Sequence, residues 1–172
     1  NYFDGNVEEV LPEVGQAVLD VFNRTHEETD YLLTYSDENR FTASQEADFL
    51  QRKTDSANNV EIIAVVDDVV AGTAGIDALG MRDKIKHRAV FGIAITKEFW
   101  GLGIGKYLME ACIECAREAG YLQLELEVVA ENERAVEMYR RAGFIEYGRN
   151  PKAFRLRTGE YQELIDMRLE LK

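Results

Sequence analysis

One glycine-spaced segment constrains the fold of this chain more than any other feature. Gly101, Gly103 and Gly105 lie between an apolar run, 89–95, and an amphipathic run that begins at Ile104. A strand, a glycine loop and a helix in this order direct several backbone N–H groups at one point, next to the positive end of the helix dipole. Glycine also lacks the Cβ that would hold a phosphate away. The segment therefore predicts a site for a phosphate-bearing ligand.

The glycine spacing disfavours the two commonest nucleotide-binding loops. A P-loop needs Ser or Thr after its Gly-Lys pair to hold magnesium, and here Tyr107 follows Lys106. The dinucleotide fingerprint reads G-x-G-x-x-G, whereas 101–105 reads G-x-G-x-G, and counting from Gly103 places the third position at Leu108. A nucleotide-dependent oxidoreductase is therefore only a distant alternative.

Two motifs resemble those of the GNAT family of N-acetyltransferases. Residues 100–105, Trp-Gly-Leu-Gly-Ile-Gly, are similar to that family's pyrophosphate loop, Gln/Arg-x-x-Gly-x-Gly/Ala, with Trp100 at the Gln/Arg position. Residues 132–144 resemble its Asn-x-x-Ala-x-x-x-Tyr-x-x-x-Gly-Phe signature at every fixed position. The resemblance covers roughly residues 60–148. The Trp-Gly-x-Gly form is similar to the branch that includes ribosomal-protein and polyamine acetyltransferases.

The resemblance implies an α/β acetyltransferase fold. Its sheet is mixed and mostly antiparallel, flanked by helices, and two central parallel strands splay apart to admit acetyl-CoA. We expect residues 1–172 to form a single N-acetyltransferase domain that moves an acetyl group to a primary amine by direct transfer in a ternary complex. The amine would belong to a small molecule, a polyamine or a protein N-terminus. The alternative is a non-catalytic coenzyme A-binding sensor or scaffold.

The resemblance also implies which residues contact the cofactor. The strand before the glycine loop would pair with pantetheine and supply a main-chain oxyanion donor, the loop amides would hold the pyrophosphate, and the second motif would touch the pantetheine arm. These residues are Ile93, Ala94, Ile95, Trp100, Gly101, Leu102, Gly103, Ile104, Gly105, Lys106, Asn132, Ala135 and Tyr139.

Two side chains are assigned catalytic roles by the same resemblance. Tyr139 occupies the position whose hydroxyl faces the coenzyme A sulfur and acts as general acid. An alkyl ammonium has a pKa near 10.4 and must lose a proton before it attacks, so a base is also expected. Glu127 matches a base position of some relatives, while Glu125 lies on the same face of the predicted strand. Glu125 and water are therefore the alternatives for the base.

The acceptor pocket is predicted less sharply. The resemblance implies that the first pair of helices and the last hairpin line it, and a surface-loop role is equally open for every candidate. These candidates are Glu27, Glu28, Thr29, Tyr31, Tyr35 and Phe154.

Composition limits the partners. The chain has 32 acidic and 20 basic residues and a net charge of −12. This charge disfavours nucleic acid as a partner, and it either favours a cationic acceptor or serves solubility.

No apolar run is long enough for a membrane span and no signal peptide is visible, so a cytoplasmic protein is expected. Cys112 and Cys115 are three apart inside a predicted helix and read as core residues, and no metal site is predicted. A homodimer is left open.

Periodicity and end signals predict the order of the elements. The expected helices are one beginning near Pro12, one from Thr42 (a capping box with Gln45) to Thr54, one over 104–119 and one over 132–143. The expected strands cover 60–66, 69–77, 88–95 (with a bulge at Gly92), 122–128, 145–148 and 161–171, with a loop over 26–40 and a turn over 154–158.

Overall fold

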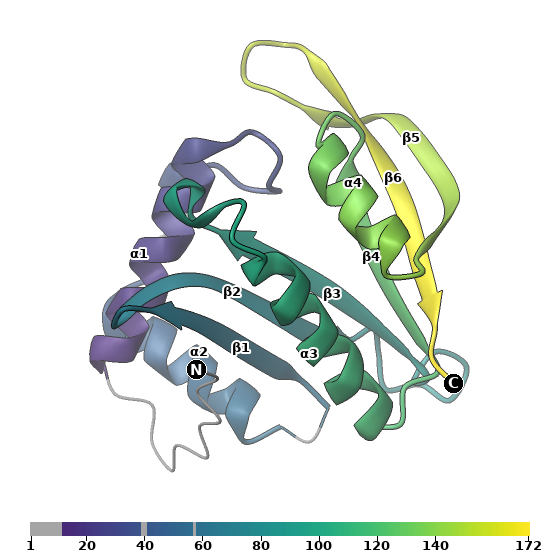
Figure 1. Cartoon of the computed structure of the whole chain (residues 1–172), viewed down its shortest axis with the longest axis horizontal. Helices are drawn as coiled ribbons and strands as arrows, with labels where there is room; N and C mark the ends of the chain where they lie inside the picture. Colours follow the sequence, from purple (N-terminus) through teal and green to yellow (C-terminus); the bar gives the residue numbers. More distant parts are fainter. Residues whose placement is uncertain (1–11, 39–40, 57) are drawn as a thin grey trace.

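The computed structural model describes residues 12–38, 41–56 and 58–172, whose elements build one mixed sheet with helices on both faces (Figure 1). Helices α1 (Pro12–Glu28) and α2 (Ala43–Thr54) cover one face, and α3 (Ile104–Glu118) and α4 (Glu133–Arg141) cover the other. The strand order is β1-β2-β3-β4-β6-β5. The strands are β1 (Val60–Val66), β2 (Val69–Ala78), β3 (Arg88–Ile95), β4 (Gln123–Val129), β5 (Ile145–Arg155) and β6 (Tyr161–Glu170), and the short 3-10 turns are η1 (Ser36–Glu38) and η2 (Lys97–Phe99).

The central parallel pair is short, and this shortness opens the sheet. Strands β3 and β4 pair only from Arg88↔Gln123 to Val90↔Glu125. Beyond that point β3 stays in register with β2 as far as Ile95, while β4 stays in register with β6 as far as Val129. Residues 91–95 of β3 therefore have no strand partner on the β4 side within the described ranges. The predicted splay is confirmed.

The bulge predicted at Gly92 is wrong. The β2–β3 register runs without a shift from Gly72↔Ile95 to Ala78↔Ala89, and Gly92 pairs regularly with Gly75. A Cβ added at Gly92 would meet no atom within 4 Å. The strands separate because each follows its own antiparallel neighbour, and no extra residue in β3 is needed.

The main core lies between the sheet and helices α3 and α4. Leu124, Met167 and Cys112 are completely buried in it, and Cys115 packs against it. Burial, with a smaller contribution from Cys115, raises the pKa of the Cys112 thiol to about 12. The thiol therefore stays protonated at neutral pH, and the prediction that the cysteines are core residues is confirmed.

Several predicted local signals are present in the structure. Thr42 Oγ1 accepts from the Gln45 N–H at 3.2 Å, and Gln45 Oε1 accepts from the Thr42 N–H at 2.8 Å, which completes the capping box at α2. The β1–β2 hairpin turns at Asp67 and Asp68, both with positive φ, as tight hairpins require. Gly120, at φ +86°, follows the end of α3.

Two boundaries differ from the prediction. The expected loop over 26–40 is shorter, since α1 continues to Glu28 and η1 forms at 36–38. At this end of α1, Thr25 Oγ1 donates to the Val21 carbonyl at 2.8 Å and the His26 ring stacks on Phe22. Strand β5 continues to Arg155 instead of ending at 148, because register shifts absorb the irregular segment that contains Pro151.

The helices of the described ranges include none that is both long enough and apolar enough to cross a bilayer.

Candidate active site

A cleft of about 1460 Å³ follows the opening between β3 and β4. Its walls come from the free edge of β3, the glycine loop with one side of α3, the inner side of α4, the outer half of β4, and the segment that follows α1. The site is thus the place where the parallel pairing ends.

The glycine loop presents unpaired backbone donors to this cleft. Gly101 and Gly103 both have positive φ, +79° and +81°, a conformation that a Cβ disfavours. Gly103 is the N-cap of α3 and provides no side-chain cap, and the first helical bond runs from the Tyr107 N–H to the Gly103 carbonyl at 3.2 Å. The N–H groups of 104–106 therefore have no intrahelical acceptor, which suits an anion.

The predicted loop residues line the cleft with one exception. Trp100, Gly101, Gly103, Ile104, Gly105 and Lys106 are part of its wall. The side chain of Leu102 is 62 % exposed and lies outside the wall. Leu102 could therefore contact a ligand in the cleft only through its backbone.

Trp100 fixes the loop against the end of β3. Its indole N–H donates to the Ile95 carbonyl at 2.8 Å, and its ring lies beneath Lys97 and beside Arg134, whose Cζ is 5.9 Å from the ring centroid. The Arg134 guanidinium is also 3.4 Å from the place that a Cβ on Gly101 would take. Arg134 is a cation beside the glycine loop that sequence reasoning missed, because it occupies a variable position of the second motif.

Tyr139 lies on the inner side of α4, at the wall of the cleft. It is 6 % exposed and packs edge-on against Phe91, with ring centroids 6.1 Å apart. Burial raises the pKa of its hydroxyl above the ordinary value, so the phenol is protonated at neutral pH. Asn132 caps α4 by accepting from the Ala135 N–H at 3.4 Å, and both residues line the cleft.

The structure separates the two glutamates that the sequence placed on one strand face. Glu125 is buried opposite Val90, in the last parallel pair, where Arg88 donates to both of its oxygens and Tyr147 donates at 3.4 Å. Glu127 lies beyond that pair, is exposed, and lines the cleft. Glu125 is therefore a structural ion-pair partner, and Glu127 is the carboxylate that reaches the cleft.

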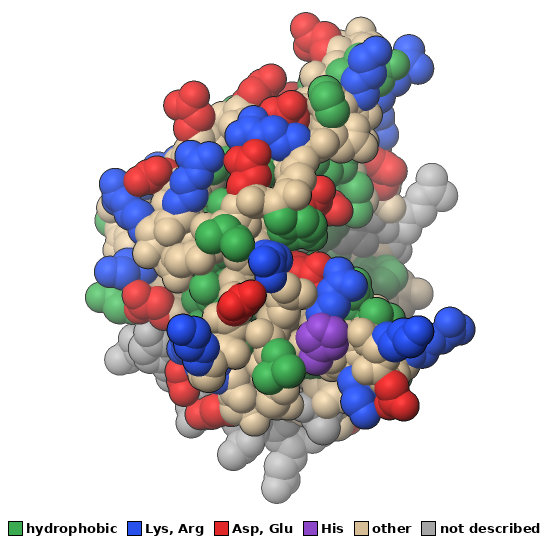
Figure 2. Space-filling model, turned by 90° about the vertical axis from the view of Figure 1, so that its right-hand side faces the viewer, with side chains coloured by type: hydrophobic (Ala, Val, Ile, Leu, Met, Phe, Trp, Pro, Cys, Tyr) green, Lys and Arg blue, Asp and Glu red, His purple; other side chains and the backbone are tan. Residues whose placement is uncertain are grey.

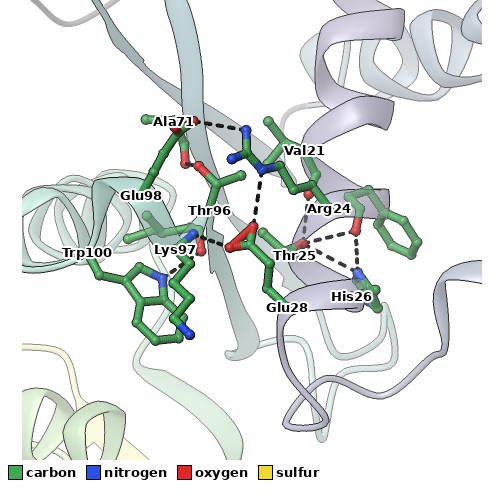
Figure 3. Close-up of polar contacts among 12 residues, drawn as sticks. Val21, Arg24, Thr25, His26, Glu28, Ala71, Thr96, Lys97, Glu98 and Trp100 are labelled. Carbon is green, nitrogen blue, oxygen red and sulfur yellow. Dashed lines mark hydrogen bonds and ion pairs between the residues drawn. The ribbon is translucent and has the colours of Figure 1, made fainter.

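The end of α1 is tied to the turn that precedes the glycine loop (Figure 3). Glu28 accepts from the Lys97 N–H at 2.8 Å and pairs with Arg24, which also pairs with Glu98 at 2.9 Å. Glu28, predicted to line the acceptor pocket, instead joins two elements of the scaffold. Glu27 is exposed and lies outside the walls of the cleft.

A smaller pocket of about 150 Å³, here called the side pocket, adjoins the cleft between residues 29–35 and the β5–β6 hairpin. Thr29 and Phe154 line both spaces, Tyr31 lines the cleft and Tyr35 lines the side pocket. These predicted acceptor residues are thus brought together.

Arg157 holds the outer wall of the side pocket. It forms a bidentate pair with Asp37 at 2.8 and 2.9 Å, its guanidinium lies 4.0 Å from the Tyr35 ring centroid, and its N–H donates to the Tyr35 hydroxyl at 2.9 Å. In the ranges that the structure describes, no group of His, Cys, Asp and Glu side chains converges in a way that would hold a metal ion.

Comparison with known proteins agrees with this geometry. Residues 18–144 match the model of the acetyltransferase (GNAT) family. The chain is 31 % identical to the L-amino acid N-acetyltransferase AaaT of Escherichia coli over 118 residues, which are 68 % of this chain and 72 % of that protein. A GNAT-family acetyltransferase of Streptococcus pneumoniae superposes with a TM-score of 0.88 at 27 % identity, over 94 % of this chain and 96 % of that one. A Salmonella typhimurium structure described as an acetyltransferase with its cofactor acetyl-CoA gives a TM-score of 0.82 at 15 % identity, over 95 % and 92 %.

Proposed function

This chain belongs to the acetyltransferase (GNAT) family, and we propose that it transfers the acetyl group of acetyl-CoA to a primary amine in a ternary complex. The observation that carries the proposal is a single cleft whose wall joins the glycine loop with its unpaired N–H groups, the side chain of Tyr139 and the exposed carboxylate of Glu127. Residues 1–172 would act as one N-acetyltransferase domain.

The residues of the cleft fit coenzyme A. The unpaired N–H groups of 104–106 would hold the pyrophosphate, with Gly101 and Gly103 allowing its close approach. Arg134 adds a positive charge beside this loop. The free edge of β3 over 93–95 would pair with the pantetheine arm as an added strand, while Asn132 and Ala135 would line its path.

Acetyl-CoA supplies a thioester carbonyl as the electrophile. Glu127 would accept the proton that the attacking amine loses, directly or through water, and a main-chain N–H of 93–95 would stabilise the oxyanion. The C–S bond then breaks with its electron pair on sulfur. Tyr139 would donate its hydroxyl proton to that sulfur. Because its raised pKa makes the phenol a weaker acid, we expect its contribution to the rate to be modest.

The acceptor class is part of the proposal. The Trp-Gly-x-Gly loop favours the acceptors of the branch with ribosomal-protein and polyamine acetyltransferases. The AaaT relative is named for L-amino acids, which adds small α-amines to the acceptors to be tested. Homodimer formation and a cytoplasmic location stay predictions.

The experiment that tests the function is release of free thiol from acetyl-CoA in the presence of amines. The panel would contain diamines, amino acids, short peptides and aminoglycosides. Thiol release with at least one amine, together with mass-spectrometric detection of the acetylated product, supports the proposal. Tight coenzyme A binding without turnover on any amine would favour the non-catalytic sensor instead.

The role of Glu127 has its own test. Glu127→Gln removes a proton acceptor while retaining shape, so turnover should fall and the acidic limb of the pH–rate profile should disappear. Glu125→Gln is the matched comparison and should lower stability, because it weakens the pair with Arg88, while leaving the profile's shape intact. An unchanged profile in Glu127→Gln at full activity would assign the proton to water.

A further inference from the structure

Gln162 carries a buried oxygen that the protein leaves without a partner. The residue lies on β6 opposite Phe154, is 3 % exposed and lines the side pocket. Its Oε1 has no hydrogen-bond donor among the residues that the structure describes. A buried carbonyl oxygen without a donor is unfavourable and uncommon in native proteins. Because Gln162 lines the side pocket, rotation of its terminal amide would turn this oxygen toward a ligand N–H there.

The charged residues around the side pocket indicate the charge and polarity of the rest of that ligand. Asp30 and Arg155 are exposed residues at the rim of the pocket. Within the described ranges neither has an ion-pair partner, and Arg155 lies against the Tyr161 ring, with its Cζ 6.0 Å from the centroid. Their opposite signs suit neither the second ammonium of a diamine nor a purely anionic tail. The remaining wall is largely apolar, with Leu32, Leu33 and Phe154. This combination fits a neutral group that has both a hydrogen-bond donor and an acceptor.

The position and size of the pocket connect it to the reaction. The side pocket joins the cleft at Thr29, Leu32, Leu33 and Phe154, so it would receive the part of the acceptor beyond the reacting amine. Its volume of about 150 Å³ corresponds to roughly five water molecules, which is the scale of one peptide unit.

We infer that the acceptor is a peptide N-terminus whose first peptide unit occupies the side pocket and donates its N–H to Gln162. This inference rests on the proposed acetyl transfer and names its substrate class. Gln162 is then a specificity-determining contact, while the α-amine itself reacts in the cleft.

The test compares two acceptors that differ in one atom. Glycyl-glycinamide has the amide N–H, and glycyl-glycolamide has an ester oxygen in its place. We expect the wild-type protein to prefer the amide in kcat/KM by about tenfold or more, because the ester leaves Gln162 unsatisfied. Gln162→Met keeps the side-chain length without the acceptor oxygen, so the preference should fall to less than about threefold.

The control is Gln51→Met, the same replacement at a half-buried position of α2 that lines neither the cleft nor the side pocket, and it should retain the wild-type preference. Circular dichroism melting of each variant shows whether it is folded before its kinetics are compared.

Each outcome decides the inference. Equal use of amide and ester by the wild-type protein would overturn it, as would an unchanged preference in folded Gln162→Met. Faster turnover of 1,5-diaminopentane than of glycyl-glycinamide would also overturn it, while leaving acetyl transfer intact. Absence of thiol release with every acceptor would instead refute the proposed function.

Discussion

At the scale of single residues, a comparison of two glycines distinguishes the effect of backbone strain from the effect of lost ligand contact. Gly103 and Gly120 have nearly the same positive φ, +81° and +86°. A Cβ at Gly103 would meet only the Tyr107 ring at 3.8 Å, and one at Gly120 would meet nothing within 4 Å. The two positions differ mainly in that Gly103 caps α3 at the cleft.

Gly103→Ala and Gly120→Ala therefore make a matched pair. Both should lose about 1 kcal/mol of stability, because alanine is strained in the left-handed region. Only Gly103→Ala should weaken coenzyme A binding, by at least about tenfold, since its Cβ takes the place that a phosphate oxygen approaches. Isothermal titration calorimetry measures the affinities, and equal affinity for coenzyme A in both variants would remove the pyrophosphate from this loop.

Tyr139→Phe separates the hydroxyl from the ring. The ring should keep its packing against Phe91 and Phe144, so the melting temperature and coenzyme A affinity should change little. A general acid contributes about 10²–10⁴-fold, and a thiolate leaves readily, so we expect kcat to fall toward the low end, near 10²-fold. Steady-state kinetics at saturating substrates provide the measurement. Near-normal kcat would make Tyr139 a packing residue.

At the scale of elements, the site depends on two contacts between segments far apart in sequence. Glu28 and Arg24 connect the end of α1 to η2 and so support the loop that follows. Arg157 connects the β5–β6 hairpin to the segment at Tyr35 and Asp37. The first contact supports the cofactor side of the cleft, and the second supports the side pocket.

Arg157→Met tests this division. The variant loses the bidentate pair with Asp37 and the contact of its guanidinium with the Tyr35 ring, so the outer wall of the side pocket should loosen. The KM for the acceptor should rise severalfold, while the affinity for coenzyme A stays the same. Arg149→Met, which removes exposed pairs with Glu146 and Glu163 on the same hairpin, is the control for loss of one surface arginine. A proportional loss of coenzyme A affinity in Arg157→Met would show that the two sides of the site are not independent.

At the scale of the whole molecule, helices on both faces of the sheet bury apolar side chains, and the α2 side adds a buried ion pair. The α3–α4 face is joined by the apolar core. On the α2 side, Lys53 is 6 % exposed at its side chain and pairs with Glu61 at 2.8 Å and Asp77 at 3.1 Å. The face in Figure 2 shows acidic and basic side chains interspersed, so the excess negative charge forms no single-sign patch there.

The buried Lys53 pair predicts a pH-dependent stability. Burial lowers the pKa of Lys53, but the negative charges of Glu61 and Asp77 raise it by more, so the pKa of Lys53 is raised overall. Burial also raises the pKa of Glu61, and the positive charge of Lys53 offsets only part of that increase. Lys53→Met would remove that offset and raise the pKa of Glu61 further. A carboxyl with a raised folded-state pKa contributes stability that is present at low pH and is lost as pH rises through that pKa.

We therefore expect Lys53→Met to cost about 3 kcal/mol at pH 7, with a smaller deficit near pH 5. Urea denaturation at the two pH values measures both quantities. The double variant Lys53→Met with Glu61→Gln should recover most of the loss, because the buried carboxylate is removed and Asp77, 61 % exposed at its side chain, is solvated without Lys53. A deficit that grows as pH falls would contradict the role of Glu61.

The sequence alone determined the features that depend on neighbouring residues. The glycine loop, the Asn132 cap, the position of Tyr139 on α4 and the capping box at Thr42 were all predictable, because each follows from local backbone geometry within a few residues. The order of strands and helices was predictable for the same reason, with errors where α1 continues to Glu28, where register shifts prolong β5 and in the bulge expected at Gly92.

The tertiary structure alone decided which side chains meet. Glu125 and Glu127 look equivalent on a strand, and only the end of the parallel pairing at Val90 buries the first and leaves the second in the cleft. Arg134 reaches the loop across the fold, and Gln162 reaches the side pocket because β6 pairs with the end of β5. The alternation of residues in a sequence predicts which side chains share one face of a strand. Which of them are buried depends on where a strand distant in sequence ends its pairing.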